Sequence, residues 1–160
     1  DAIAAAALAD PDVERVVDLA GDNNSEAVNL RAYVRGLVGR EIPAAVTEIE
    51  QLLAGMPAPP PEYLDTRGFL RHLDGRDEEA LIDIDEAISL TQQQRQQMML
   101  LAGRVDRVEL LQRMRSLDHA LAVMLHHRGL IFDSLDLTEQ AQADFELARR
   151  KGFAPERGIL

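Results

Sequence analysis

The chain has 160 residues, a length at which one domain buries enough apolar surface to hold a stable core. Its 28 acidic residues outnumber 17 basic ones, and the formal net charge of −11 repels phosphate backbones, so we expect no nucleic-acid partner. Cysteine is absent, which excludes disulfides, thiol nucleophiles and thiolate metal sites together.

The chain starts with an apolar stretch at residues 2–9. This stretch is too short to span a bilayer and lacks the basic segment of a signal peptide, so we expect a short helix and no membrane insertion. Because residue 1 is Asp, we expect a processed product or a piece of a longer bacterial-type polypeptide. Its compartment, cytoplasm or periplasm, stays open.

Glycine and proline mark the ends of the next helices. A cap and an early proline open an amphipathic helix at residues 10–21, and helices at 25–38 and 43–53 follow, each with a glycine behind it. The proline-rich stretch 57–61 cannot continue a helix, because proline lacks an amide donor and clashes with the preceding turn. We interpret it as a stiff connector.

The second half of the chain continues this pattern with longer helices. We expect helices at residues 62–73 and 77–102, the second passing through a Gln-rich run. From residue 105 to 125 an apolar stripe fits either one long helix or two helices broken near Ser116. A last helix covers residues 139–150, and aromatic residues, at only 4% of the chain, leave small aliphatic side chains to pack these helices closely.

An internal repeat becomes visible when Arg67-Gly68 is aligned with Arg128-Gly129, an offset of 61 positions. The same offset places Ala80 on Ala141, Asp83 on Asp144, Ile84 on Phe145 and Ala87 on Ala148. Small residues at such positions let two helix axes approach, and a large residue one turn later fills the groove between them. The pattern therefore predicts antiparallel helical hairpins that must stack to bury their faces.

These residues resemble the tetratricopeptide-repeat family, whose mark is Gly-x2-aromatic, then Ala-x3-aromatic or aliphatic, then a further Ala. The last copy matches this mark at Gly129, Phe132, Ala141, Phe145 and Ala148. The middle copy matches at Gly68, Ala80, Ile84 and Ala87, with Arg71 in place of the aromatic residue. A weaker first copy, with one extra turn residue, comprises Ala32, Tyr33, Gly39, Ala45, Ile49 and Leu52.

The resemblance implies an all-α fold in which antiparallel hairpins stack as a short right-handed α-solenoid of about 7–8 helices. We expect a single domain over residues 1–160. Its expected segments are N-terminal helices (1–25), a degenerate repeat (26–56), a repeat (61–92), an irregular or extended helical segment (93–117), a repeat (118–152) and a tail (153–160).

The resemblance also implies a peptide groove, lined by the first helix of each hairpin on the face away from the second helix. The candidate groove residues are Asn29, Tyr33, Glu62, Asp65, Phe69, His72, His126, Leu130 and Asp133. Family members that grip a C-terminal carboxylate use Lys, Arg and Asn, but the matching places here hold Asp65, Phe69, His126 and Leu130. This acidic and apolar groove favours a protein or peptide partner that presents an apolar or basic segment.

Other functions have weaker support from the residues. His119 and His126 lie two helical turns apart, whereas helical metal ligands are usually one turn apart, and no phosphate loop or catalytic triad is visible, so we expect no metal, no cofactor and no enzyme activity. Two alternatives stay open. The exposed stripe from Met98 to Met114 could pair with a second copy as a homodimer, or the chain could be a helical domain of a larger enzyme.

The Gln-rich run at residues 92–99 has two interpretations. It is either an interaction element of its own, because glutamine extends a helix without adding charge and Met adapts to irregular surfaces, or the exposed far end of a long helix.

Overall fold

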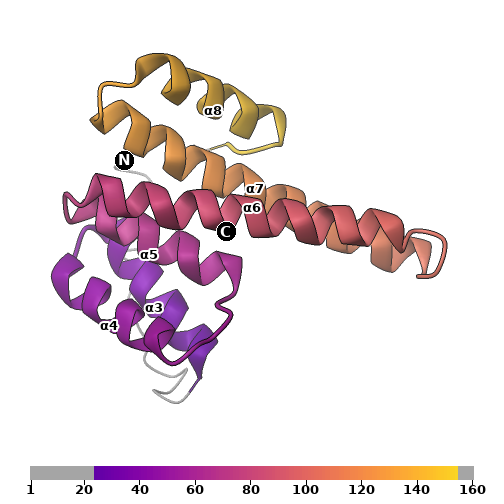
Figure 1. Ribbon diagram of the computed structural model, residues 1–160, viewed down its shortest axis with the longest axis horizontal. Coiled ribbons are helices and arrows are strands. Elements are labelled where there is room, and N and C mark those ends of the chain that lie inside the picture. Colours follow the sequence, from indigo (N-terminus) through magenta and orange to yellow (C-terminus); the bar gives the residue numbers. More distant parts are fainter. Residues whose placement is uncertain (1–23, 155–160) are drawn as a thin grey trace.

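The computed structural model describes residues 24–154, which form six α-helices and no strand (Figure 1). The helices are α3 (Ser25–Val38), α4 (Ile42–Ala54), α5 (Pro61–Leu73), α6 (Asp77–Leu100), α7 (Arg107–Ser134) and α8 (Thr138–Arg150). The all-α class expected from the sequence is confirmed. The helices expected within residues 1–23 and the end of the tail lie outside the described residues.

The helix ends follow local chemistry. At the start of α3, the Asn24 side chain accepts a hydrogen bond from the Glu26 amide at 3.0 Å. At its end, Gly39 adopts a left-handed conformation with φ 65°, which glycine reaches without a steric penalty. Both α4 and α5 carry proline in the first turn, where the missing amide costs no hydrogen bond.

The long apolar region after residue 93 forms two helices joined by a turn at residues 101–106. The break comes before α7, because the Asp106 side chain accepts hydrogen bonds from the amides of Val108 and Glu109 and caps the new helix. Ser116 is exposed and α7 passes through it without interruption. The segment 93–117 is therefore helical on both sides of one turn.

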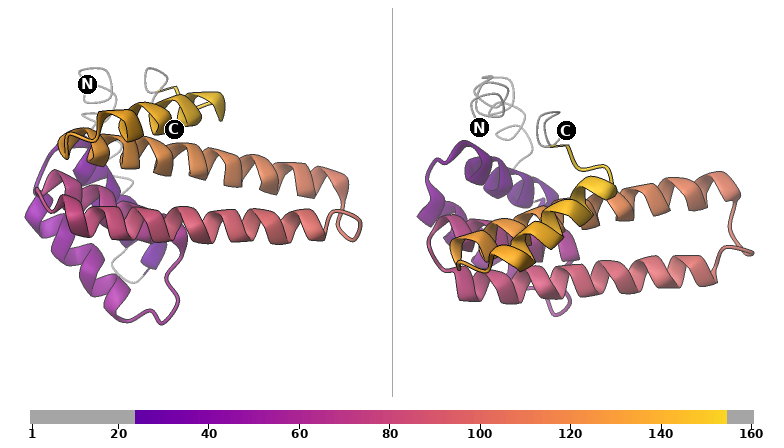
Figure 2. Two further views of the ribbon diagram at one scale, coloured as in Figure 1. Left: turned by 45° about the horizontal axis from the view of Figure 1, so that its top comes forward. Right: turned by 90° about the horizontal axis from the view of Figure 1, so that it is seen from above.

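Neighbouring helices form three antiparallel hairpins, α3–α4, α5–α6 and α7–α8. The first helices of the hairpins also contact one another, since α5 packs against both α3 and α7. Figures 1 and 2 show that α6 and α7 continue side by side well beyond the other helices. The described chain thus has a packed body and a projecting two-helix part.

Glycines mark the closest approaches between helices. A Cβ added at Gly68 would lie 2.8 Å from Ile84 Cδ1 and 3.1 Å from the Ala80 carbonyl oxygen, so α5 and α6 pack almost backbone to backbone. A Cβ at Gly129 would lie 2.5 Å from the Phe145 ring on α8. The large residues named by the repeat therefore fill the space that the missing side chains leave.

An arginine–carboxylate pair crosses each of the three hairpins. The arginine always precedes the small residue of the first helix, and the acid always precedes the large residue of the second. The pairs are Arg31 with Glu48, Arg67 with Asp83 and Arg128 with Asp144. Two of them are bidentate, with N–O distances of 2.6 and 2.8 Å at Asp83 and of 2.6 and 2.9 Å at Asp144.

Arg71, which stands where the family pattern has an aromatic residue, extends this network between hairpins. Its guanidinium donates to Asp83 on α6 at 2.7 Å and to Glu50 on α4 at 2.8 Å. The hydrogen bond from Arg71 lowers the pKa of Glu50 below its usual value. At the equivalent place in the last hairpin, Phe132 lies under the Arg128 guanidinium, 5.5 Å from it.

We predict that Gly68→Ala destabilises the fold by about 1–3 kcal/mol, because the new methyl group overpacks a contact that includes the α6 backbone. Gly103→Ala is the matched control, since a Cβ there meets nothing within 4 Å. Urea unfolding of the three proteins measures the difference. Equal midpoints for both variants would contradict the close approach of α5 and α6.

We also predict that Arg128→Met lowers the free energy of unfolding by about 3 kcal/mol, because it leaves the buried carboxylate of Asp144 without its bidentate partner. Arg113→Met removes the exposed pair with Glu109 instead and should cost less than about 0.5 kcal/mol. Chemical denaturation tests both. A similar loss in the free energy of unfolding for both variants would show that the buried pair stabilises the fold no more than the exposed pair.

Candidate functional site

The first helices of the hairpins bring most of the expected groove residues to neighbouring positions. Asn29 and Tyr33 lie on α3, Glu62, Asp65, Phe69 and His72 on α5, and His126, Leu130 and Asp133 on α7. Because α5 contacts both α3 and α7, residues of the three helices can meet there. We call this surface the first-helix face.

An aromatic cluster forms the interior of the first-helix face. The rings of Phe69 and His127 stack at 4.3 Å, and Tyr33 lies 5.8 Å from Phe69 and 6.0 Å from His127. His127 Nδ1 lies 2.9 Å from Asp65 Oδ1, and Asp65, Phe69 and His127 are all buried. Asp65 and Phe69 thus hold α5 against α7 and are not exposed at the surface.

His127 is missing from the groove residues expected on sequence grounds. The spacing of His127 could have indicated its burial, because it follows Met124 by three residues and precedes Ile131 by four, which puts it on the same helix face as these two buried residues. A polar residue on an apolar stripe needs a buried partner. The neighbouring His126 was named instead.

His126 lies in a different environment from the other groove candidates. Its ring stacks on Phe153 at 4.4 Å and is tilted to Phe145 at 5.4 Å, which places it toward α8 and the residues that follow it. Burial of the ring, and then the nearby His127, lower the pKa of His126 to about 4. The ring is therefore neutral at physiological pH.

Two buried polar atoms on α3 have no hydrogen-bond partner in the described part of the chain, Asn29 Oδ1 and the Tyr33 hydroxyl. Burial, and to a smaller extent the negative charge of Asp65, raise the pKa of Tyr33, so the hydroxyl keeps its proton. Unsatisfied buried groups are uncommon, and each costs on the order of 1–3 kcal/mol.

The accessible acidic groups of the first-helix face are Glu62 and Asp133, both exposed. His72 is half-buried, and its Nδ1 lies 2.6 Å from Asp77 Oδ1. The other oxygen of Asp77 accepts from the Ser134 hydroxyl at 2.8 Å, so this chain of contacts joins α5, α6 and α7 at one end. Leu130 is half-buried on α7.

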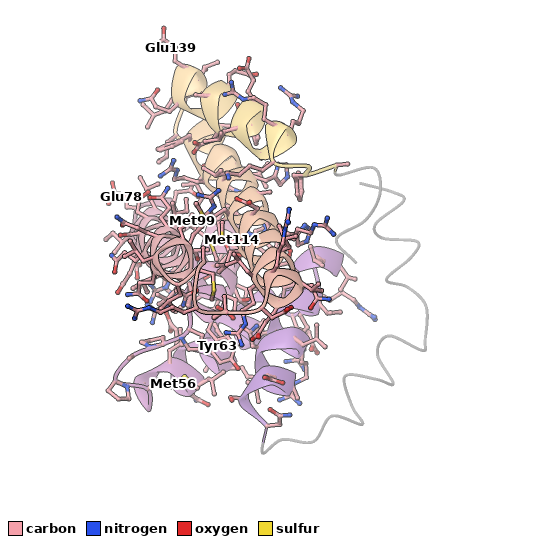
Figure 3. All side chains as sticks on the ribbon, turned by 90° about the vertical axis from the view of Figure 1, so that its right-hand side faces the viewer. Met56, Tyr63, Glu78, Met99, Met114 and Glu139 are labelled. Carbon is pink, nitrogen blue, oxygen red and sulfur yellow. The ribbon has the colours of Figure 1, made fainter. Side chains whose placement is uncertain are left out.

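The second accessible feature is the projecting part of α6 and α7, residues 92–120, which we call the arm. Its large exposed apolar side chains are Met99, Leu100, Leu101, Val108 and Leu111. Met98 and Met114 are half-buried, and Met98 shares a shallow depression with Leu117 of the opposite helix. Figure 3, seen from the free end of the arm, shows Met99 and Met114 where α6 and α7 meet.

The arm is fastened to the body by one group of charges. Asp118 on α7 accepts from Arg95 of α6 at 3.1 Å and from Lys151, just after α8, at 2.9 Å. Burial acts to raise the pKa of Asp118, but the hydrogen bonds and positive charges of Lys151 and Arg95 together lower it below its usual value. Past this group, toward the tip, α6 and α7 pack only against each other among the helices of residues 24–154 (Figure 2).

Residues 24–154 contain no group of three or more His, Asp or Glu side chains placed to hold a metal ion. Within the same range, no helix has the length and apolar character needed to cross a membrane. Comparisons of the chain with protein-family models, characterised proteins and solved structures find no match. The chemistry of its two accessible surfaces therefore carries the functional interpretation.

We predict a loss of stability in acid that depends on His126. The pKa of this ring is about 4 in the folded protein and near its usual 6.5 in the unfolded chain. The unfolded chain therefore takes up a proton that the native fold excludes, and stability falls as the pH decreases from about 6.5 to about 4.

Between pH 7 and pH 5 this linkage should cost about 1 kcal/mol, after a discount for the partial exposure of the ring. Thermal melts of His126→Gln should show a shallower decline of Tm over this interval than the wild-type protein. His119→Gln, at an exposed position on the same helix, should follow the wild type. If the Tm of His126→Gln declined as steeply as that of the wild-type protein, His126 would not be the cause of the acid-dependent loss of stability.

Proposed function

We propose that this chain is a non-catalytic scaffold that binds a segment of another protein on its first-helix face. In this proposal the three hairpins stack in the manner of a short right-handed tetratricopeptide-like solenoid. The observation that carries it is the recurrence of one hairpin design, an arginine and a small residue on the first helix facing an acid and a large residue on the second. Repeated hairpins of this kind commonly present extended binding surfaces.

The contacts between first helices support this proposal. α5 packs against α3 and α7, and a Cβ added at Gly36 of α3 would lie 2.9 Å from Leu70 and 3.2 Å from Phe69 of α5. Such close packing of α3 on α5 supports an arrangement in which the first helices form one layer. A ligand lying across this layer would contact residues from several hairpins at once.

The proposed ligand is an apolar or basic segment. Glu62 and Asp133 are exposed carboxylates on first helices, and they would pair with Lys or Arg of the ligand. Leu73 is exposed beside α3, and Leu130 is half-buried on α7, so apolar side chains are available next to the charges. Asp65 is buried and already paired with His127, so it is not accessible to contact a ligand.

A peptide-array screen tests this function. We expect apolar peptides that contain Lys or Arg to bind, and Glu62→Lys with Asp133→Lys to weaken that binding by about tenfold, because two attractive charges become repulsive. The control is Glu78→Lys with Glu139→Lys, which makes the same change of charge at exposed positions on α6 and α8 (Figure 3). Binding of acidic peptides alone, or equal losses for both double variants, would contradict the proposal.

A further inference from the structure

The arm has a charge opposite to that of the rest of the protein. Residues 92–120 contain five arginines against three acidic residues, a net charge of +2 in a chain whose total is −11. The arm contains no lysine, so all of its formal positive charge is guanidinium. This segregation gives the arm a different class of electrostatic partner from the body.

Three of these arginines lie at the outer part of the arm without a carboxylate partner in residues 24–154, namely Arg104, Arg107 and Arg115. All three are exposed. The arginines of the body differ, since Arg67, Arg71 and Arg128 each contact at least one acid. In a chain with an excess of acidic groups, the tip of the arm keeps guanidinium donors free for another molecule.

Apolar side chains are exposed beside these arginines. Leu100 is 78% exposed, Val108 62% and Met99 56%, although all are large and apolar. Val108, Leu111 and Arg115 follow one another at helical spacing along a single stripe of α7, roughly 10 Å long. An exposed apolar surface rimmed by charge marks an interaction site.

We propose that the arm is a docking site for an acidic amphipathic segment of another protein. The apolar residues of that segment would cover Met99, Val108 and Leu111, and its carboxylates would pair with Arg104, Arg107 and Arg115. A guanidinium presents a planar fork of donors that matches a carboxylate. The glutamines of α6 on the same arm supply neutral hydrogen-bonding groups.

The composition of the arm disfavours the other partners that a basic and apolar tip could have. Lipid-binding elements use aromatic residues at the interface, and residues 92–120 contain none. A second arm would bring the free arginines of two copies together, which opposes arm-to-arm pairing. The proposed site is separate from the first-helix face and takes a ligand of the opposite charge.

The test begins with a phage-displayed library of random peptides, selected on the wild-type protein. Enriched peptides are then measured by fluorescence anisotropy against Arg107→Glu with Arg115→Glu. The matched control is Arg149→Glu with Arg150→Glu, which changes the charge equally at two exposed arginines of α8. A second arm variant, Val108→Ser with Leu111→Ser, tests the apolar part without changing charge, and circular dichroism confirms that all variants fold.

We expect a set of acidic peptides with Leu, Ile or Phe at helical spacing. Their affinity should fall about tenfold or more on both arm variants and with added salt, but stay unchanged on the α8 control. Glu62→Lys with Asp133→Lys should leave this set unaffected, which separates the result from the first-helix face.

The inference is overturned if no enriched peptide is both acidic and weakened by the arm variants. Two further assays identify the rival partners. A concentration-dependent doubling of mass in light scattering that Arg107→Glu with Arg115→Glu abolishes would assign the arm to a second copy. Co-sedimentation with phosphatidylserine-containing vesicles that the same variant abolishes would assign it to lipid.

Discussion

The spacing of the hairpins depends on a guanidinium that crosses from one helix to the next beside a residue with little or no side chain. The small residue lets the helices approach closely, and the partial removal of the ion pair from water strengthens it. The ion pair in turn makes the burial of Asp83 and Asp144 tolerable, since an uncompensated buried carboxylate would cost several kcal/mol. Neither feature is stable without the other. Together they set the distance between paired helices, and that distance places the first helices in contact.

The same chemistry decides which acidic groups remain available at the surface. Asp65 is bonded to His127 inside the body, and Asp83 and Asp144 are paired with arginines, so none of these buried carboxylates is accessible at the surface. The surplus of acid is therefore displayed by exposed residues such as Glu62 and Asp133. On the arm the balance is reversed, because its arginines exceed the carboxylates within reach. The first-helix face and the arm thus differ in charge, although both are built from helices of the same hairpins.

Much of the fold could be predicted from the sequence, because glycine, proline and small-residue spacing are local signals. The limits of α3, α4, α5 and α8 agree with the predicted helices to within one or two residues. A new helix after residue 103 was also predicted, but the apolar stripe alone left open whether it breaks near Ser116, where α7 in fact continues. The buried cluster of Phe69 and His127 was not predicted: the sequence placed Phe69 and His126 in a peptide groove, and one residue along a helix is a rotation of about 100°, enough to face another element. The ion pair of Arg67 with Asp83 depends on how two helices pack. The alignment of the repeats showed that both residues recur, but not that they contact each other.

Because α6 and α7 continue from the body into the arm without a break, the length of the arm can change without a change in the packing of the body. Their neighbours α5 and α8 have 13 residues each, whereas α6 has 24 and α7 has 28. The outer turns of α6 and α7 therefore extend past the packed body, which fixes only the direction in which they project. Removing or adding seven residues in each helix would move the tip by roughly 10 Å while keeping the same faces in register. The distance at which the tip meets its surroundings is therefore adjustable in steps, with the hairpin stack left as it is.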